Sequence, residues 1–373
     1  MLFRPSRSVA AVVRRLFLGI RFLLQVGLVT WATLAIHYSD LPWAWARLVL
    51  ALTFLAFSAW ALWLARTPRR ALAFTAVFLG VLGWWVRIAP SHDRHWPPEV
   101  AVMPRAIIDG DRVRILGYRS FTHRSRDEVD VRYEERDVSL SHLAGLDFFV
   151  SYWMPGPVGH TFVSFVFDDA PPVCISIETR PEVGEGFSPI ASLFKQFELI
   201  YVVGDERDLV GVRTGHRNED VYLYRIQTAP ENVRRLFLVY LDRMNELADR
   251  AEFYHLLSNS CTVNIVRYAN AAGRSGRLDL RHVLNGLIDR YLYASGRLDT
   301  SLPFEELRRR SRITEAAQSA AGAPDFSQRI RVGVPGMPPL GRRTPDRRDS
   351  PPGRREPAPR SGAGMPAISS GVP

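Results

Sequence analysis

A cysteine at the start of a predicted helix is the residue of this sequence best placed to act as a nucleophile. Cys261 follows Asn259 and Ser260, two residue types that commonly cap helices, and precedes an apolar-periodic segment that stops at Gly273. The partial positive charge at a helix N-terminus lowers the pKa of a thiol and favours the thiolate. The competing interpretation is a buried structural cysteine, which is a common environment for free thiols. Cys174 lies in an apolar strand pattern, and there the structural interpretation is favoured.

A thiol nucleophile needs a base, and His160 is the histidine with the most suitable context. It follows the Gly156–Gly159 turn and begins a predicted strand that runs to Phe167. The base of a thiol enzyme is near the cysteine in space rather than in sequence, so the separation from Cys261 is no obstacle. We therefore predict that His160 accepts the thiol proton.

A third residue has to orient the imidazole, and the next predicted strand offers Glu178. The strand after His160 and the one that begins at residue 173 are predicted to form a hairpin with its turn centred near Ala170. In that register Glu178 lies two residues from the position opposite His160. Side chains alternate between the two faces of a strand, so both residues share a face. Ser176 and Glu182 have the same parity and remain alternatives.

Residues beside the cysteine are candidates for contact with a substrate or with an oxyanion. Asn259, Ser260 and Tyr254 all lie within seven residues of Cys261. The backbone N–H groups of the first helical turn are further oxyanion donors.

A metal site is the main alternative use of these side chains. His216 and His255 could join His160 and Cys261 as ligands, but the sequence lacks the close paired spacing of zinc ligands. It also lacks a glycine-rich phosphate-binding loop. We therefore expect neither a metal nor another cofactor.

These residues belong to a predicted α+β domain that spans residues 91–310. Strand patterns come first and helix patterns follow them, which is typical of this fold class. The predicted helices run from about 230 to 249 and from about 261 to 272, with Pro230 in the first turn of one and Gly273 after the other. The predicted strands cover residues 106–108, 113–118, 129–133, 148–153, 160–167, 173–178 and 221–226.

Residues 1–90 are predicted to form a bundle of three transmembrane helices. Apolar stretches at about 16–37, 48–65 and 71–86 are each close to the length that crosses a bilayer. A cleavable signal peptide is the alternative for the first stretch, but no small-residue cleavage site stands out. Arginines gather in the N-terminal leader and between the second and third stretches, which places both inside and the domain outside.

Residues 311–373 are rich in Pro, Gly, Arg and Ser, and this composition predicts a disordered tail. The formal net charge of the chain is +10, carried almost entirely by arginine and concentrated in the leader, the membrane flanks and this tail. No single face interleaves basic and aromatic residues, so we expect no nucleic-acid partner.

Four motifs in this order resemble the periplasmic domain of the Lnb type, a family named for a bacterial lipoprotein N-acyltransferase. The resemblance covers about residues 107–288. The family is itself similar to circularly permuted papain-like (NlpC-like) thiol enzymes, in which the histidine precedes the cysteine. The motifs are Phe148–Trp153 before the His160 strand, Ser176–Arg180, Phe197–Asp208 and Tyr254–Thr262.

The resemblance implies Cys261 as nucleophile, His160 as base and Glu178 at an acidic position. One departure is that Ser260 precedes the cysteine where the family often has Asn, and the Thr-Thr that often follows is Thr262-Val263 here. Together with the three predicted spans and the arginine placement, the resemblance predicts a multi-pass protein of the bacterial inner membrane whose catalytic domain faces the periplasm.

The expected function is a thiol acyltransferase or hydrolase that uses an acyl-enzyme, with a membrane lipid or lipoprotein as its substrate. One alternative is a cysteine amidase or peptidase that acts on cell-wall peptides. The other is a non-catalytic envelope module that binds a partner.

Overall fold

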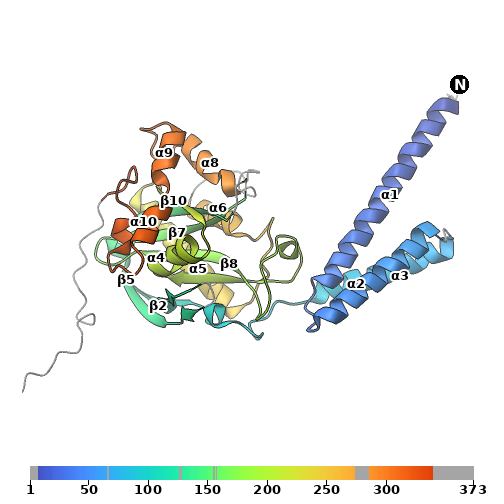
Figure 1. The fold of residues 1–373 in the computed structure, drawn as a ribbon, viewed down its shortest axis with the longest axis horizontal. Coiled ribbons are helices and arrows are strands. Elements are labelled where there is room, and N and C mark those ends of the chain that lie inside the picture. The colour runs from blue at the N-terminus through green and yellow to red at the C-terminus, as the bar shows by residue number, and fades with distance from the viewer. Residues whose placement is uncertain are drawn as a thin grey trace, which may run out of the picture. The chain divides into compact units, whose positions relative to one another are not determined.

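The structure is a computed structural model that describes residues 7–64, 67–125, 128–153, 156, 158–273 and 285–338. Three of its helices are long and apolar enough to span a membrane, over residues 11–37, 44–64 and 68–87. These segments match the three predicted spans. They comprise α1 (Arg7–His37), α2 (Ala44–Ala59) with the π-helical turn η1 (Trp60–Leu64), and α3 (Pro68–Arg87) (Figure 1).

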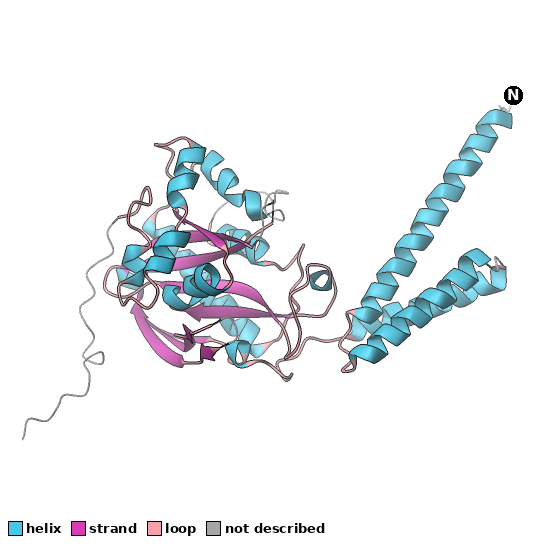
Figure 2. Ribbon diagram, viewed as in Figure 1, coloured by secondary structure: helices cyan, strands magenta, loops and turns pink. Residues whose placement is uncertain are grey.

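The domain is built on a mixed sheet with the strand order β1-β2-β9-β8-β7-β6-β10, and β5 also pairs with β2. The pairings are antiparallel apart from the contact of β2 with β9. The strands, drawn as magenta arrows in Figure 2, are β1 (Arg105–Asp109), β2 (Arg112–Arg119), β5 (Tyr133–Ser139), β6 (Leu143–Tyr152), β7 (His160–Phe167), β8 (Val173–Arg180), β9 (Glu198–Gly204) and β10 (Asp220–Arg225), with β3 (Thr122–His123) and β4 (Val129–Asp130) as a separate pair.

Helices cover both faces of this sheet, and the α+β prediction is confirmed. The period-2 pattern of β7 sends Phe165 toward α5, where it meets the ring of Phe237 at 4.7 Å, while Phe162 belongs to the core on the opposite face. The helices are α4 (Glu206–Gly211) with the π-helical turn η5 (Val212–His216), α5 (Pro230–Asp249), α6 (Cys261–Ala271), α8 (Ile288–Ala294), α9 (Phe304–Ser311), α10 (Thr314–Ser319) and α11 (Phe326–Arg329). The short 3-10 turns among the described residues are η2 (Pro98–Val100), η3 (Leu140–His142), η4 (Ala191–Leu193) and η6 (Asn285–Leu287).

The chain stays folded beyond residue 310, contrary to the predicted domain boundary. Helices α10 and α11 lie on the face of the sheet opposite α5, where Ile313, Phe326 and Ile330 are buried. The Arg/Pro/Gly-rich composition of this segment predicted disorder because its apolar residues are few. Those few residues are nevertheless buried, since they cover a sheet face that water would otherwise reach. The predicted disorder of residues 339–373 lies outside the described residues.

The hairpin of β7 and β8 is shifted by two residues from the predicted register. Its first pair is Phe165 with Val173, and Phe162 faces Ser176. Val173 therefore pairs with Phe165 and not with Phe167, and the connection between the paired residues is two residues longer than predicted. Continuing this register sets position 178 opposite His160, and the predicted shared face is retained.

Candidate active site

Helix α6 places the candidate nucleophile at its first residue. Ser260 is the N-cap, but its side chain makes no capping hydrogen bond. Cys261 is buried, at 2% exposed, and its Sγ lies 3.8 Å from Thr262 Oγ1. That hydroxyl lies 2.7 Å from Thr161 Oγ1, on the strand residue next to His160. The contact between the two hydroxyls holds the cysteine helix against the strand that carries the predicted base.

The pKa of Cys261 is lowered to about 6. Burial acts in the opposite direction, because it disfavours the charged thiolate. The charge of His160 and its hydrogen bond to the thiol outweigh burial, and hydrogen bonds from Thr161 add to their effect. The thiol and the imidazole are therefore coupled, and His160 favours the thiolate form of Cys261.

The other side of the imidazole faces a hydroxyl and a carboxylate. His160 Nε2 lies 2.7 Å from Ser176 Oγ and 3.8 Å from Glu178 Oε1. The second distance is too long for a direct hydrogen bond, so Ser176 is the immediate partner and Glu178 acts as the nearby charge. Of the alternatives by parity, Glu182 pairs instead with Arg94, at 3.1 Å.

A buried arginine that the sequence did not predict completes this network. Arg213 Nη2 donates to Glu178 Oε1 at 2.6 Å, and the Arg213 side chain is only 3% exposed. Burial raises the pKa of Glu178, but the Arg213 cation and then His160 outweigh it and hold that pKa well below its usual range. Arg213 also lies 4.7 Å from the centre of the Phe162 ring, which is stacked on His160. No local pattern marks Arg213, one of many arginines in the chain, as a site residue.

The residues predicted to contact substrate differ in their surroundings. Tyr254 is buried beside Cys261, and burial followed by the thiol charge raises the pKa of the phenol. The side chain of Asn259 donates to the Phe253 carbonyl at 2.9 Å and accepts from Asn264 at 3.0 Å. It therefore braces the loop before α6, and its amide already has partners.

The predicted alternative metal ligands are not brought together. His216 bonds to the carbonyl of His123 at 3.1 Å, and His255 lies 3.0 Å from Ser258 Oγ. Neither of these contacts involves the thiol or His160.

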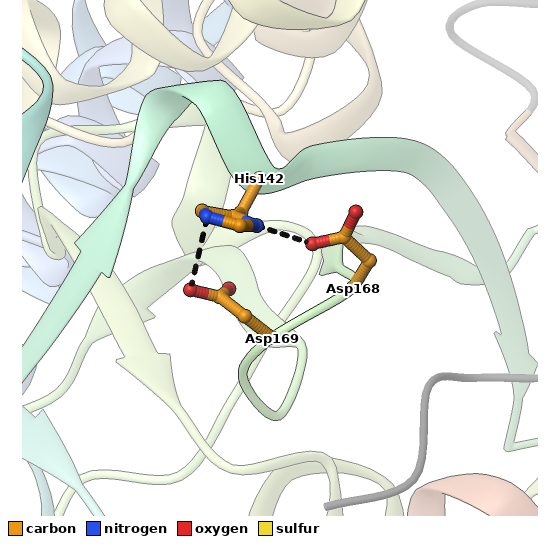
Figure 3. Close-up of side chains that lie close together, drawn as sticks. All are labelled: His142, Asp168 and Asp169. Atoms are coloured by element: carbon orange, nitrogen blue, oxygen red, sulfur yellow. Dashed lines mark hydrogen bonds and ion pairs between the residues drawn. The ribbon is translucent and has the colours of Figure 1, made fainter.

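Within the described part of the chain, a different group has metal-ligand spacing: His142, Asp168 and Asp169 (Figure 3). His142 Nδ1 lies 2.7 Å from Asp168, and its other ring nitrogen lies 3.8 Å from Asp169. The hydrogen bond to Asp168, followed by the charge of Asp169, raises the pKa of His142. The group is exposed at the far end of the β7–β8 hairpin from His160, and an ion pair accounts for it.

Fold and site together define a membrane-anchored α+β domain with a buried, coupled cysteine and histidine. Residues 130–291 match the family model described as the Lnb N-terminal periplasmic domain, which confirms the predicted family and includes His160, Glu178 and Cys261. The protein is a membrane protein with a periplasmic domain, and residues 130–291 are the part that matches this family model. No curated protein and no solved structure matched the chain.

The contacts of Glu178 predict that Arg213 affects the thiol only through this carboxylate. Glu178→Gln should raise the apparent pKa of Cys261, because the imidazolium loses its nearby anion. Arg213→Met leaves a buried carboxylate without its cation and should destabilise the protein by about 3–5 kcal/mol. The double variant should recover part of that stability and show the same thiol pKa as Glu178→Gln alone.

The measurement is the pH dependence of iodoacetamide alkylation, combined with urea unfolding of each variant. Arg119→Met is the matched control, since Arg119 pairs with the buried Asp208 at 2.7 Å in a separate cluster. It should lower stability without moving the thiol pKa. Additive effects of Glu178→Gln and Arg213→Met on that pKa would show that Arg213 acts by another route.

Proposed function

We propose that this protein is a thiol acyltransferase or hydrolase of the bacterial inner membrane that works through an acyl-enzyme on Cys261. The observation that carries the proposal is the coupled pair of Cys261 and His160, with the thiol pKa near 6 at the first turn of a helix. Such a pKa is typical of catalytic thiols and uncommon for buried structural ones. The permuted papain-like arrangement, with the histidine strand before the cysteine helix, is part of this proposal.

The reaction begins with transfer of the Cys261 proton to His160. The thiolate attacks an ester or amide carbonyl carbon, and the carbonyl electrons move to oxygen to give a tetrahedral oxyanion. Backbone N–H groups in the first turn of α6 are suited to stabilise that oxyanion, since the first turn of a helix lacks i−4 carbonyl partners. When the carbonyl re-forms, the leaving alcohol or amine takes the proton from His160 and a thioester remains.

The second half of the reaction returns the thiol. An amine or a water molecule gives a proton to His160 and attacks the thioester carbonyl. Collapse of this intermediate expels the thiolate, which is the form that the low pKa of Cys261 favours. Transfer and hydrolysis differ only in the acceptor.

The acyl group most consistent with the architecture belongs to a membrane lipid or lipoprotein. The anchor has three candidate spans, and the first strand of the domain begins at Arg105, shortly after the last span ends at Arg87. A domain tethered this closely meets membrane-bound esters and amides at high effective concentration. Cell-wall peptides are the second candidate, supported by the likeness to NlpC-like enzymes.

The test is to trap the acyl-enzyme on the full-length protein in nanodiscs. The protein is incubated separately with phospholipid, a diacylated lipopeptide and a cell-wall muropeptide, quenched in acid and measured by intact mass. We expect an acyl-mass adduct from a lipid donor in the wild type and in Cys174→Ala, and none in Cys261→Ala. A muropeptide adduct would identify the amidase instead, and the lack of any adduct with all three donors would contradict the enzyme proposal.

A further inference from the structure

Exposed apolar side chains gather on the loops that surround the candidate active site. Of the twelve large hydrophobic residues that are exposed after the last span in the described part of the chain, six lie on three loops next to His160 and Cys261. We call this set the apolar rim. It consists of Trp153, Val158, Val183, Phe187, Ile190 and Leu257.

The sheet topology brings the three loops to one end of the domain. Strand β6 ends at Tyr152, and its antiparallel neighbour β7 begins at His160, so the loop between them lies at the same end as the loop after β8. Trp153 on the first of these loops contacts Phe187 on the second, with their ring centres 6.2 Å apart. The third loop precedes α6 and is tied to the second by a 3.0 Å hydrogen bond from Leu256 N to Ser192 O.

The segment that leaves the membrane is bonded to the same loops. Helix α3, the third span, ends at Arg87. Shortly after it, Arg94 pairs with Glu182 at 3.1 Å, and the Val183 N–H donates to the His95 carbonyl at 2.9 Å. The rim loop after β8 is therefore attached to the chain within a few residues of the end of the span.

The one lysine of the chain makes this attachment at the helix end itself. Lys195 Nζ donates to three backbone carbonyls in the last turn of α3 and just beyond it, at 2.7 to 3.0 Å. A compact ammonium with three donors suits three converging carbonyls better than a planar guanidinium does. The carbonyls belong to Trp85, Val86 and Ile88.

We propose that the apolar rim is a membrane-contact surface that inserts into the interfacial layer of the bilayer crossed by the anchor. Exposed Trp, Phe, Ile and Leu on neighbouring loops are the composition that partitions into this layer. The bilayer is the proposed occupant because the rim loop after β8 is bonded to the end of the third span and to the chain just beyond it. The surface goes beyond the proposed function: it would let a substrate reach the Cys261 end of the domain from the bilayer.

The experiment measures the depth of single labels on the full-length protein in vesicles. Both native cysteines are replaced by alanine, and one cysteine is introduced by Phe187→Cys or Leu257→Cys and labelled with an environment-sensitive NBD dye. The matched control is Asp169→Cys, an exposed residue (42% for the side chain) at the opposite end of β7, about 25 Å away along the strand. The vesicles contain phosphatidylethanolamine and phosphatidylglycerol, with or without lipids that carry a doxyl quencher near the headgroup.

We expect the doxyl lipids to reduce the fluorescence of both rim labels by at least a third and to leave the Asp169 label unchanged. Equal quenching at the rim and at Asp169, or no quenching at either rim position, would overturn the proposal. The labelled proteins lack Cys261, so this outcome is independent of whether that thiol is catalytic. If the rim labels are quenched but the trapping experiment finds no acyl-enzyme on Cys261, the membrane-contact surface is supported and the proposed function is contradicted.

Discussion

Replacing His160 with alanine is expected to slow the alkylation of Cys261 at pH 7 by about five- to a hundredfold. With the thiol pKa at about 6, most of Cys261 is thiolate at this pH. Without the imidazole, burial dominates and the pKa rises above its ordinary value, so the thiolate becomes a small fraction. The lower end of the range reflects the greater intrinsic nucleophilicity of a thiolate with a higher pKa.

The measurement is the second-order rate of iodoacetamide labelling, read by peptide mass spectrometry so that Cys174 is scored separately. His142→Ala is the matched control, because His142 is exposed and lies at the opposite end of the hairpin from His160. It should leave the rate unchanged. An unchanged rate in His160→Ala would mean that the imidazole does not activate the thiol.

Replacing Arg331 with methionine is expected to destabilise the domain by about 3–5 kcal/mol. The Arg331 side chain is 4% exposed and pairs with Asp147 at 2.8 Å and with Glu206 at 2.6 Å, two carboxylates that are themselves fully buried. Removing the guanidinium weakens the compensation of both charges in a region of low dielectric. The loss should also loosen the segment after α10 from the sheet.

The free energy of unfolding is measured by urea titration of the full-length protein in mild detergent, with pulse proteolysis to detect the unfolded fraction. Arg329→Met is the control two residues away, since Arg329 is exposed and pairs with Asp325, the residue that precedes the same short helix. Exposed pairs of this kind contribute about 0.5 kcal/mol or less. Similar midpoints for the two variants would show that the buried ion cluster does not anchor the C-terminal segment.

Local signals predicted much of the domain. Pro230 in a first turn and Gly273 after a last turn marked the two helices on which the thiol side of the site depends, and alternating apolar residues marked the strand that starts at His160. Cys261 could be selected because helix capping and thiol chemistry point to the same residue. These features are set by neighbours in sequence, which is why a single sequence reveals them.

Features that depend on contacts between distant segments were not predictable. Arg213 pairs with Glu178 across 35 positions of the chain, and nothing next to it in sequence indicates that pairing. Strand β9 was not predicted, although it lies in the middle of the sheet, because a strand buried on both faces lacks the alternation that marks a half-exposed strand. Arg331 looked like part of a polar tail, and only the buried Asp147 and Glu206 explain its position.

The coupling of Cys261 to His160 is tested most directly by the pH dependence of Cys261 alkylation in the full-length wild-type protein. The rate is measured from pH 4.5 to pH 9.5 and assigned to Cys261 by peptide mass. The structure predicts a rate that reaches half of its plateau near pH 6, since the thiolate fraction falls as pH drops through the thiol pKa. A rate that is small at pH 7 and still rising above pH 8.5 would contradict a thiol activated by His160.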